Sequence, residues 1–159
     1  MRENAQVFRN YPDLSARRRS DNGWHFTCSD QVQMTDKIVV MPGSARLDLQ
    51  ALKAVAADFG WTVRVAGNVR DAVSAQAVLF YRDALGSTCS WLDAVLRLRR
   101  ELPDARLIVC HGLSETIDWP QLSDAGAFHA LGLPLRVSEV RQSLGFLSAA
   151  EKRLSTARA

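Results

Sequence analysis

Three polar residues follow apolar, strand-like runs, and their side chains are the first candidates for chemistry. Arg82 and Asp83 follow the run at 77–81, and His111 follows the run at 107–110. A guanidinium at a strand end can act as a permanent counter-ion, so we expect Arg82 to pair with Asp83 or another carboxylate, or else to be solvated. Imidazole titrates near neutral pH. No acid and nucleophile are spaced to act with His111, so we predict no catalytic residue.

The loop Pro42-Gly43-Ser44-Ala45-Arg46 lies between a predicted strand and a predicted helix. Backbone N–H groups at such a place favour phosphate, so this loop is a candidate anion site. It is similar to the start of NADPH-dependent flavin reductases, which implies an FMN- and NADPH-binding enzyme as one alternative. Those proteins continue with small hydroxyl residues, whereas this chain continues Leu47-Asp48-Leu49. One short loop motif is weak evidence for a cofactor, so we predict none.

Cysteine and histidine spacing predicts no metal site and no disulfide framework. Cys28, Cys89 and Cys110 are far apart, and the pair His25 and Cys28 lacks a second pair of ligands. The net charge of +3 is too mild to indicate nucleic-acid binding. No apolar run is long enough for a membrane span, and the N-terminus lacks a signal-peptide core. We therefore expect a cytoplasmic protein with no nucleic-acid or membrane partner.

Strands and helices are predicted to alternate from Lys37 onward. Short β-branched runs favour strands, helical spacing of apolar residues favours helices, and Asp118 and Ser138 are predicted helix caps. The predicted strands are 38–41, 62–65, 77–81, 107–110 and 128–131. The predicted helices are 46–59, a short one at 70–76, one over 92–102, one over 120–125 and a last one from about Ser138 that extends to about Ala157.

This alternation predicts an α/β domain with a doubly wound, five-stranded parallel sheet and helices on both faces, a flavodoxin-like fold. Ligands of such sheets bind at the carboxyl ends of the strands. We expect a domain over 37–150, preceded by a polar, flexible extension over 1–36 and followed by a helical or frayed tail over 151–159. Met34, just before the first strand, is a candidate natural start.

Three segments resemble response-regulator receiver (CheY-like) domains. Residues 60–68 resemble the second strand and its turn, 102–109 the entry to the fourth strand, and 125–135 the fifth strand and its turn. The resemblance runs from Lys37 to about Leu147. It implies a domain of two-component signalling or a phosphorelay, in which an aspartate accepts a phosphoryl group.

The resemblance places several phosphorylation positions on residues that cannot do this chemistry. The two magnesium-binding acids match Pro42 and Gly43, which offer no side-chain oxygen. The phosphate-accepting aspartate matches Arg82, and Asp83 becomes a phosphoacceptor candidate only after a slip of one residue. We prefer to interpret Asp83 as an exposed loop carboxylate.

The remaining positions have changed as well. A serine or threonine matches His111, the lysine that holds the phosphoryl group matches Leu133, and the aromatic residue of the fifth strand matches Ala130. Without a metal ion or a lysine, a phosphorylated aspartate lacks its main counter-charges. The resemblance therefore implies a degenerate, or pseudo-receiver, domain, with a receiver phosphorylated on Asp83 as an alternative.

We expect such a domain to act by binding another signalling or regulatory protein. The family's partner surface maps here onto the apolar candidates Trp119, Ala130, Leu135, Val140 and Leu144, with Leu133 at the rim of the former phosphorylation site. The alternative is that these side chains fill the core. Val140, Leu144, Leu147 and Leu154 also have near-heptad spacing, so a homodimer through the last helix is a further expectation.

Overall fold

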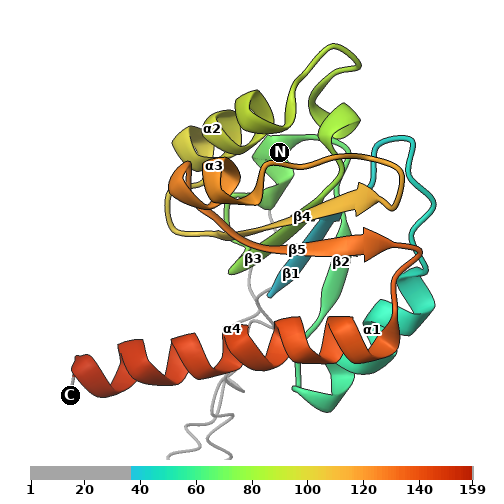
Figure 1. Ribbon diagram of the computed structural model, residues 1–159. Helices are drawn as coiled ribbons and strands as arrows, with labels where there is room; N and C mark the ends of the chain where they lie inside the picture. The colour runs from blue at the N-terminus through green and yellow to red at the C-terminus, as the bar shows by residue number, and fades with distance from the viewer. Residues whose placement is uncertain (1–36, 159) are drawn as a thin grey trace, which may run out of the picture. The chain divides into compact units, whose positions relative to one another are not determined.

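The computed structural model describes residues 37–158. The expectations for the extension over 1–36, for Met34 and for His25 and Cys28 lie outside the described residues. Strands and helices alternate through this part of the chain (Figure 1). In chain order the elements are β1 (Ile38–Met41), α1 (Leu49–Asp58), β2 (Val63–Val65), the 3₁₀ turn η1 (Val69–Ala72), β3 (Ala77–Phe80), the 3₁₀ turn η2 (Arg82–Leu85), α2 (Trp91–Glu101), β4 (Arg106–Gly112), α3 (Trp119–Asp124), β5 (Ala127–Leu133) and α4 (Val137–Ala157).

The five strands form one parallel sheet in the order β2-β1-β3-β4-β5. The chain moves outward from β1 to β2 and then returns past β1 to β3, so the strand order reverses between β1 and β3. This is the flavodoxin-like order, whose switch point is a ligand site in open α/β sheets. The predicted fold class is confirmed.

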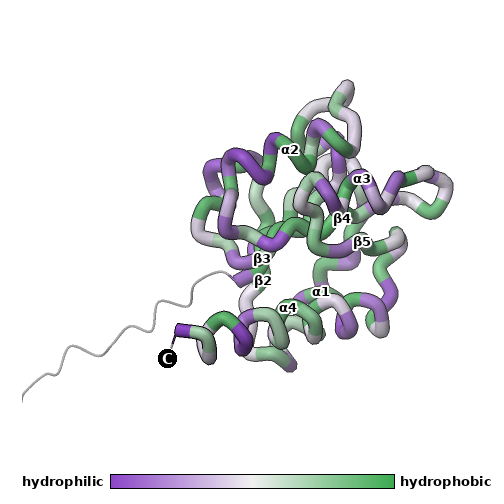
Figure 2. The backbone as a smooth tube through the Cα atoms, turned by 60° about the vertical axis from the view of Figure 1, so that its left-hand side comes forward, coloured by the Kyte–Doolittle hydropathy of each residue, from purple (hydrophilic) through white to green (hydrophobic). Residues whose placement is uncertain are grey.

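Both faces of the sheet are covered, which explains why the central strands β1 and β3 are apolar throughout. Every residue of β1 and β3 is buried. Alternate strand residues point to opposite faces. Val39, Val78 and Val109 lie in the core cluster that includes residues of η1, α2 and α3, while Val40 and Leu79 lie in the cluster that includes residues of α1 and α4. In Figure 2, β3 and β4 run largely through hydrophobic residues, whereas the colouring along α2 is mixed.

Polar caps set the starts of three helices. Asp48 accepts a hydrogen bond from the Ala51 amide at 3.0 Å, Ser90 accepts one from the Asp93 amide at 3.1 Å, and Asp118 accepts one from the Gln121 amide at 3.2 Å. The predicted Asp118 cap is confirmed, whereas α1 begins three residues later than predicted because Asp48 caps it. The predicted Ser138 cap is wrong. Arg136 occupies the cap position of α4 without a side-chain cap, and Ser138 lies inside the first turn.

Two helical segments, one between β2 and β3 and one at the end of the domain, differ in length from an ordinary helix of this fold. The short helix predicted at 70–76 is only the 3₁₀ turn η1, capped by Asn68 through the Asp71 amide at 3.1 Å. By contrast, α4 has 21 residues and continues past the edge of the sheet (Figure 1). Among residues 37–158 there is no helix with the length and apolar character needed to cross a membrane.

Candidate functional site

The candidate site lies in the loops at the carboxyl ends of the strands, where ligands of open α/β sheets bind. It is built from three loops, 42–44 after β1, 81–83 after β3 and 112–115 around the end of β4, and we call this group of loops the C-terminal cleft. Met41 pairs with Phe80 across β1 and β3, and the Tyr81 amide donates to the Met41 carbonyl at 3.1 Å. The first two loops therefore begin level with each other at the switch point.

Asp83 is held by the loop that follows β1. The Ser44 amide lies 3.1 Å from Asp83 Oδ1 and 3.2 Å from Oδ2, and the Ser44 hydroxyl donates to Oδ2. Hydrogen bonds to an ionised carboxylate are among the stronger ones in proteins. Asp83 is therefore a half-buried anchor between two loops, and the expectation of a merely exposed loop carboxylate is corrected.

Gly43 makes this anchor possible. Its φ of +55° is in the left-handed region, and a Cβ built on it would lie 1.9 Å from Asp83 Oδ1 and 2.7 Å from the Ala84 amide nitrogen. A residue with a side chain does not fit this approach. The position that matches a magnesium-binding acid in receiver domains is therefore filled by backbone packed against Asp83.

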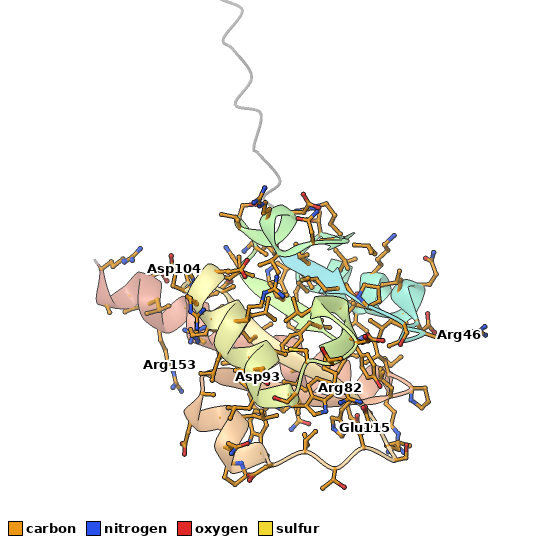
Figure 3. All side chains as sticks on the ribbon, turned by 90° about the horizontal axis from the view of Figure 1, so that it is seen from above. Arg46, Arg82, Asp93, Asp104, Glu115 and Arg153 are labelled. Carbon is orange, nitrogen blue, oxygen red and sulfur yellow. The ribbon has the colours of Figure 1, made fainter. Side chains whose placement is uncertain are left out.

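Arg82 pairs with Glu115, which comes from the loop after β4. Arg82 Nε lies 3.4 Å from Glu115 Oε1, and the Gly112 amide donates to Oε2 at 2.7 Å. Figure 3 labels Arg82 and Glu115 next to each other. The Glu115 side chain is only 19% exposed, so solvent screens this pair less than a fully exposed one. Of the alternatives left open for Arg82, pairing with a carboxylate other than Asp83 is the one observed.

Tyr81 completes this cluster. Burial raises the pKa of the Tyr81 hydroxyl above 10.0, and a hydrogen bond to the Glu115 carboxylate and its negative charge raise it further. The Tyr81 ring also contacts Trp91 edge-on, with ring centroids 5.7 Å apart. Tyr81 and Glu115 therefore link the end of β3 to the β4 loop and to α2.

The other two candidate positions do not point to chemistry in the cleft. His111 is the penultimate residue of β4, and its Nδ1 lies 3.1 Å from the carbonyl of Gly112. Leu133, at the end of β5, packs against the core cluster under α1 and α4. Neither residue is brought together with Asp83 by a hydrogen bond or ion pair among the described residues.

The cleft does not fit a magnesium ion. Pro42 and Gly43 supply no side-chain oxygen, and the nearby carboxylates of Asp83 and Glu115 are already bound by Ser44 and Arg82. Mg²⁺ requires oxygen ligands in near-octahedral geometry. Between residues 37 and 158 no group of three or more histidine, cysteine, aspartate or glutamate side chains could hold a metal ion.

Two amides of the Pro42–Arg46 loop are already used within the domain. The Ser44 amide donates to Asp83, and the Ala45 amide donates to the Pro42 carbonyl at 2.9 Å. The first helical residue after the loop is Leu49, so the helix start is not at the loop. These contacts use two of the amide donors that a phosphate-binding loop would offer, and they disfavour a phosphate site here.

The predicted interaction residues divide into two groups. Trp119, Ala130 and Leu135 are partly buried against the core. Val140 and Leu144 are each only 1% exposed, so their prediction as surface residues is corrected. They face the sheet because α4 covers it, and Leu147 does the same. Of the four residues with near-heptad spacing, only Leu154 is exposed, which leaves little of the stripe for a second copy of the chain.

Sequence reasoning missed Ser44, Tyr81 and Glu115 as parts of the cleft. Ser44 was visible only as part of a phosphate-loop motif, and Tyr81 as the end of a strand. Glu115 lies in a polar loop with no pattern of its own. Each becomes significant because the parallel register brings the loops after β1, β3 and β4 to one edge.

The strand order and the cleft at its switch point define an open, doubly wound α/β domain, and within that class the chain has the fold of a response-regulator receiver (CheY-like) domain. The structure of a receiver domain protein from Clostridium thermocellum aligns with 74% of this chain, and the alignment covers 97% of that protein's chain, with 18% sequence identity and a TM-score of 0.54. A pilus assembly-related protein from Burkholderia pseudomallei matches 74% of this chain and 92% of its own, with 18% identity and a TM-score of 0.53.

Longer proteins share this fold over one part of their length. NtrX from Brucella abortus matches 76% of this chain with 15% identity and a TM-score of 0.55, and the match spans 28% of NtrX. No family model matches the chain, and no curated protein does. At these identities the likeness establishes the fold alone.

Proposed function

We propose that residues 37–158 form a receiver-type regulatory domain of two-component signalling that acts by binding another protein, without efficient phosphorylation of an aspartate. The observation that carries this proposal is the contact between Ser44 and Asp83. Both carboxylate oxygens of Asp83 accept from the Ser44 amide or hydroxyl, and Gly43 packs against them. A phosphoryl group on Asp83 would displace this loop.

The charges around Asp83 favour the same proposal. Transfer of a phosphoryl group depends on positive charge placed to stabilise its oxygens. The lysine position is Leu133, and the guanidinium of Arg82 lies 3.4 Å from Glu115. Arg82, the arginine next to Asp83 in the sequence, is therefore already engaged by Glu115 and is not free to stabilise a phosphoryl group on Asp83.

Apolar side chains near the cleft offer a surface for a protein partner. Leu113, in the loop after β4, is 70% exposed, and Val137 at the start of α4 is 51% exposed. A Cβ on Gly132 would lie 3.3 Å from Leu113, which places this leucine over the end of β5. We expect Leu113 and Val137 to contribute to partner binding, because each exposes an apolar side chain that contact with a protein would bury.

Treatment with acetyl phosphate and Mg²⁺, followed by intact mass measurement, tests the proposal. We expect no phosphoprotein from the wild-type chain, and none from Leu133→Lys, because the metal-binding acids stay absent. Beryllofluoride with Mg²⁺ should leave the amide resonances of Asp83 and Ser44 unchanged.

A phosphoprotein that disappears in Asp83→Asn would overturn the proposal and favour the phosphorylated alternative. Phosphoprotein formed by Leu133→Lys alone would contradict the match of Pro42 and Gly43 to the metal-binding positions. A yellow purified protein, or quenching of added FMN fluorescence, would favour the flavin-binding alternative instead.

A further inference from the structure

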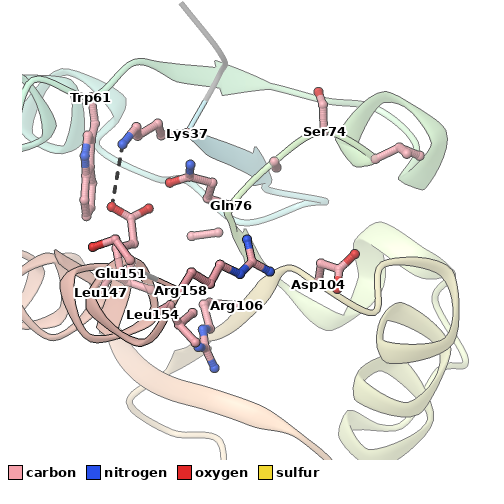
Figure 4. Close-up of a pocket in the computed structure, with 14 residues that line it drawn as sticks. Lys37, Trp61, Ser74, Gln76, Asp104, Arg106, Leu147, Glu151, Leu154 and Arg158 are labelled. Atoms are coloured by element: carbon pink, nitrogen blue, oxygen red, sulfur yellow. Dashed lines mark ion pairs between the residues drawn. The ribbon is translucent and has the colours of Figure 1, made fainter. Parts of the chain in front are cut away.

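The long last helix creates a pocket at the edge of the sheet opposite the C-terminal cleft. The pocket has a volume of about 480 Å³ and lies between the last two turns of α4 and the starts of β1, β3 and β4 (Figure 4). These strand starts are joined by backbone hydrogen bonds, from the Gln76 amide to the Lys37 carbonyl at 3.1 Å and from the Arg106 amide to the Gln76 carbonyl at 2.8 Å. The floor of the pocket is therefore part of the sheet.

One wall of the pocket is apolar and contains an aromatic ring. Trp61 is 8% exposed and packs against Phe59, with ring centroids 5.4 Å apart. Leu147 is buried beside it, and Leu154 is 55% exposed at the mouth. A rigid indole next to leucine side chains favours a flat apolar ligand.

The charged groups of the pocket leave an excess of positive charge. Lys37 Nζ lies 3.6 Å from Glu151 and 5.5 Å from the Trp61 ring centroid, so its charge is paired. Arg106 stacks on Phe128 at 5.5 Å. Within the described residues neither Arg106 nor Arg158 has an ion-pair partner, and Figure 4 shows the Arg158 side chain extending between Glu151 and Asp104.

We propose that this pocket binds a small organic anion with an apolar, preferably aromatic, body. The apolar body packs against Trp61, Leu147 and Leu154, and the anionic group accepts hydrogen bonds from Arg158, with the charge of Arg106 nearby. The volume is in the range of small-molecule sites, about 300–1,000 Å³. Because the pocket lies at the other edge of the sheet, the proposal does not depend on the function of the cleft.

Titration of the full chain with 2-naphthoate, followed by NMR of the Trp61 indole N–H, tests this proposal. We expect saturable shifts of that resonance and of the Gln76 amide. Naphthalene-2-methanol, which has the same ring system without the charge, should bind at least about tenfold more weakly, because it lacks a charge-assisted hydrogen bond to arginine.

Matched variants separate the pocket from a general effect of charge. Arg158→Gln should weaken 2-naphthoate binding about fivefold or more, as expected for a lost charge-assisted contact. Arg153→Gln, which removes the same charge from the same helix outside the pocket, should leave binding unchanged. Leu154→Asn should weaken binding as well, whereas Leu96→Asn, at an exposed leucine of α2 outside the pocket, should not.

Three results would overturn the proposal. These are the absence of a saturable shift at millimolar 2-naphthoate, equal binding of the neutral alcohol, and equal loss of affinity in Arg158→Gln and Arg153→Gln. All four altered side chains are exposed, so each variant should unfold at the same urea concentration as the wild-type chain. The same urea curves identify a variant that fails for lack of folding.

Discussion

Gly43 controls the geometry of the C-terminal cleft through a single missing methyl group. We expect Gly43→Ala to destabilise the domain by about 2 kcal/mol, because alanine is strained at φ +55° and its Cβ would collide with Asp83. Urea unfolding followed by circular dichroism measures the change. The matched control is Gly67→Ala, where a Cβ has no neighbour within 4 Å, and there the change should stay within about 0.5 kcal/mol. Equal stability of the two variants would show that Asp83 is not packed against Gly43.

Tyr81 makes the free energy of unfolding of the domain fall at high pH. Its folded pKa is raised above 10.0 by burial, by the hydrogen bond to Glu115 and by the charge of that carboxylate. The unfolded chain therefore loses the phenol proton first as the pH rises. The contribution of Tyr81 is fully present below pH 10 and is lost as the pH rises through the folded pKa.

Glu115→Gln tests this origin of the shift. The variant should lower the pKa of Tyr81 toward its ordinary value without reaching it, since burial remains. Absorbance at high pH, with Tyr81→Phe subtracted to remove the other tyrosine, reports the titration. A pKa of Tyr81 that does not fall in Glu115→Gln would mean that Glu115 does not contact the phenol.

The pairing of Arg82 shows what the sequence can and cannot say about single residues. An arginine directly after a strand is compatible with a counter-ion role or with a solvated side chain, and the structure shows an ion pair. The choice of Glu115 over Asp83 could not be predicted, because it depends on how the loop after β4 turns back so that Glu115 also accepts from the Gly112 amide. Asp83 is meanwhile bound by Ser44, through a turn that only glycine allows.

At the scale of elements, Arg99 joins the turns at the opposite edge of the sheet. From α2 it donates to the carbonyls of Pro103 at 2.7 Å, Ala105 at 3.2 Å and Gly126 at 3.1 Å. The guanidinium thereby satisfies both the α2–β4 and the α3–β5 connections. Gly126 has a φ of +106°, and a Cβ there would lie 2.7 Å from Arg99 Nε, so the two residues fit only together.

Arg99→Lys should therefore destabilise the domain by about 2 kcal/mol, since a lysine cannot form the planar fork and leaves carbonyls without donors. Thermal unfolding by calorimetry measures it. Arg100→Lys, the neighbouring exposed arginine, should change the stability by less than about 0.5 kcal/mol. If both variants had the same melting temperature, the turns would not depend on Arg99.

Most elements were predictable because their signals are local. The strand runs and the Asp118 cap predicted β1 through β5 and α3 within a few residues. The turn η1 and the length of β5 were not predictable, because they depend on pairing and on coverage by distant parts of the chain. For the same reason Val140 and Leu144 could not be told apart from surface residues by spacing alone, since only the packing of α4 on the sheet buries them.

At the scale of the whole molecule, the reactivities of the two cysteines within residues 37–158 should depend on openings of different size. Cys110 lies in the middle of the sheet with no exposed surface, and burial raises the pKa of its thiol to about 12. Cys89 is half-buried in the loop before α2. A thiol reacts as the thiolate, so Cys110 can react only after the sheet opens, whereas Cys89 needs no more than a local fluctuation.

Alkylation with iodoacetamide, followed by peptide mass spectrometry, turns this difference into a measure of global stability. Cys89 should be modified in the native protein, and Cys110 should follow the fraction of unfolded chain as urea is added. Gly43→Ala should speed the native-state modification of Cys110 by about thirtyfold, the factor that corresponds to about 2 kcal/mol, and should leave Cys89 unchanged. Such a result would mean that the loop that holds Asp83 and the core around Cys110 unfold together, as one cooperative unit. Modification of Cys110 that is as fast as that of Cys89, or that ignores Gly43→Ala, would instead mean that β4 opens independently of the loop that holds Asp83.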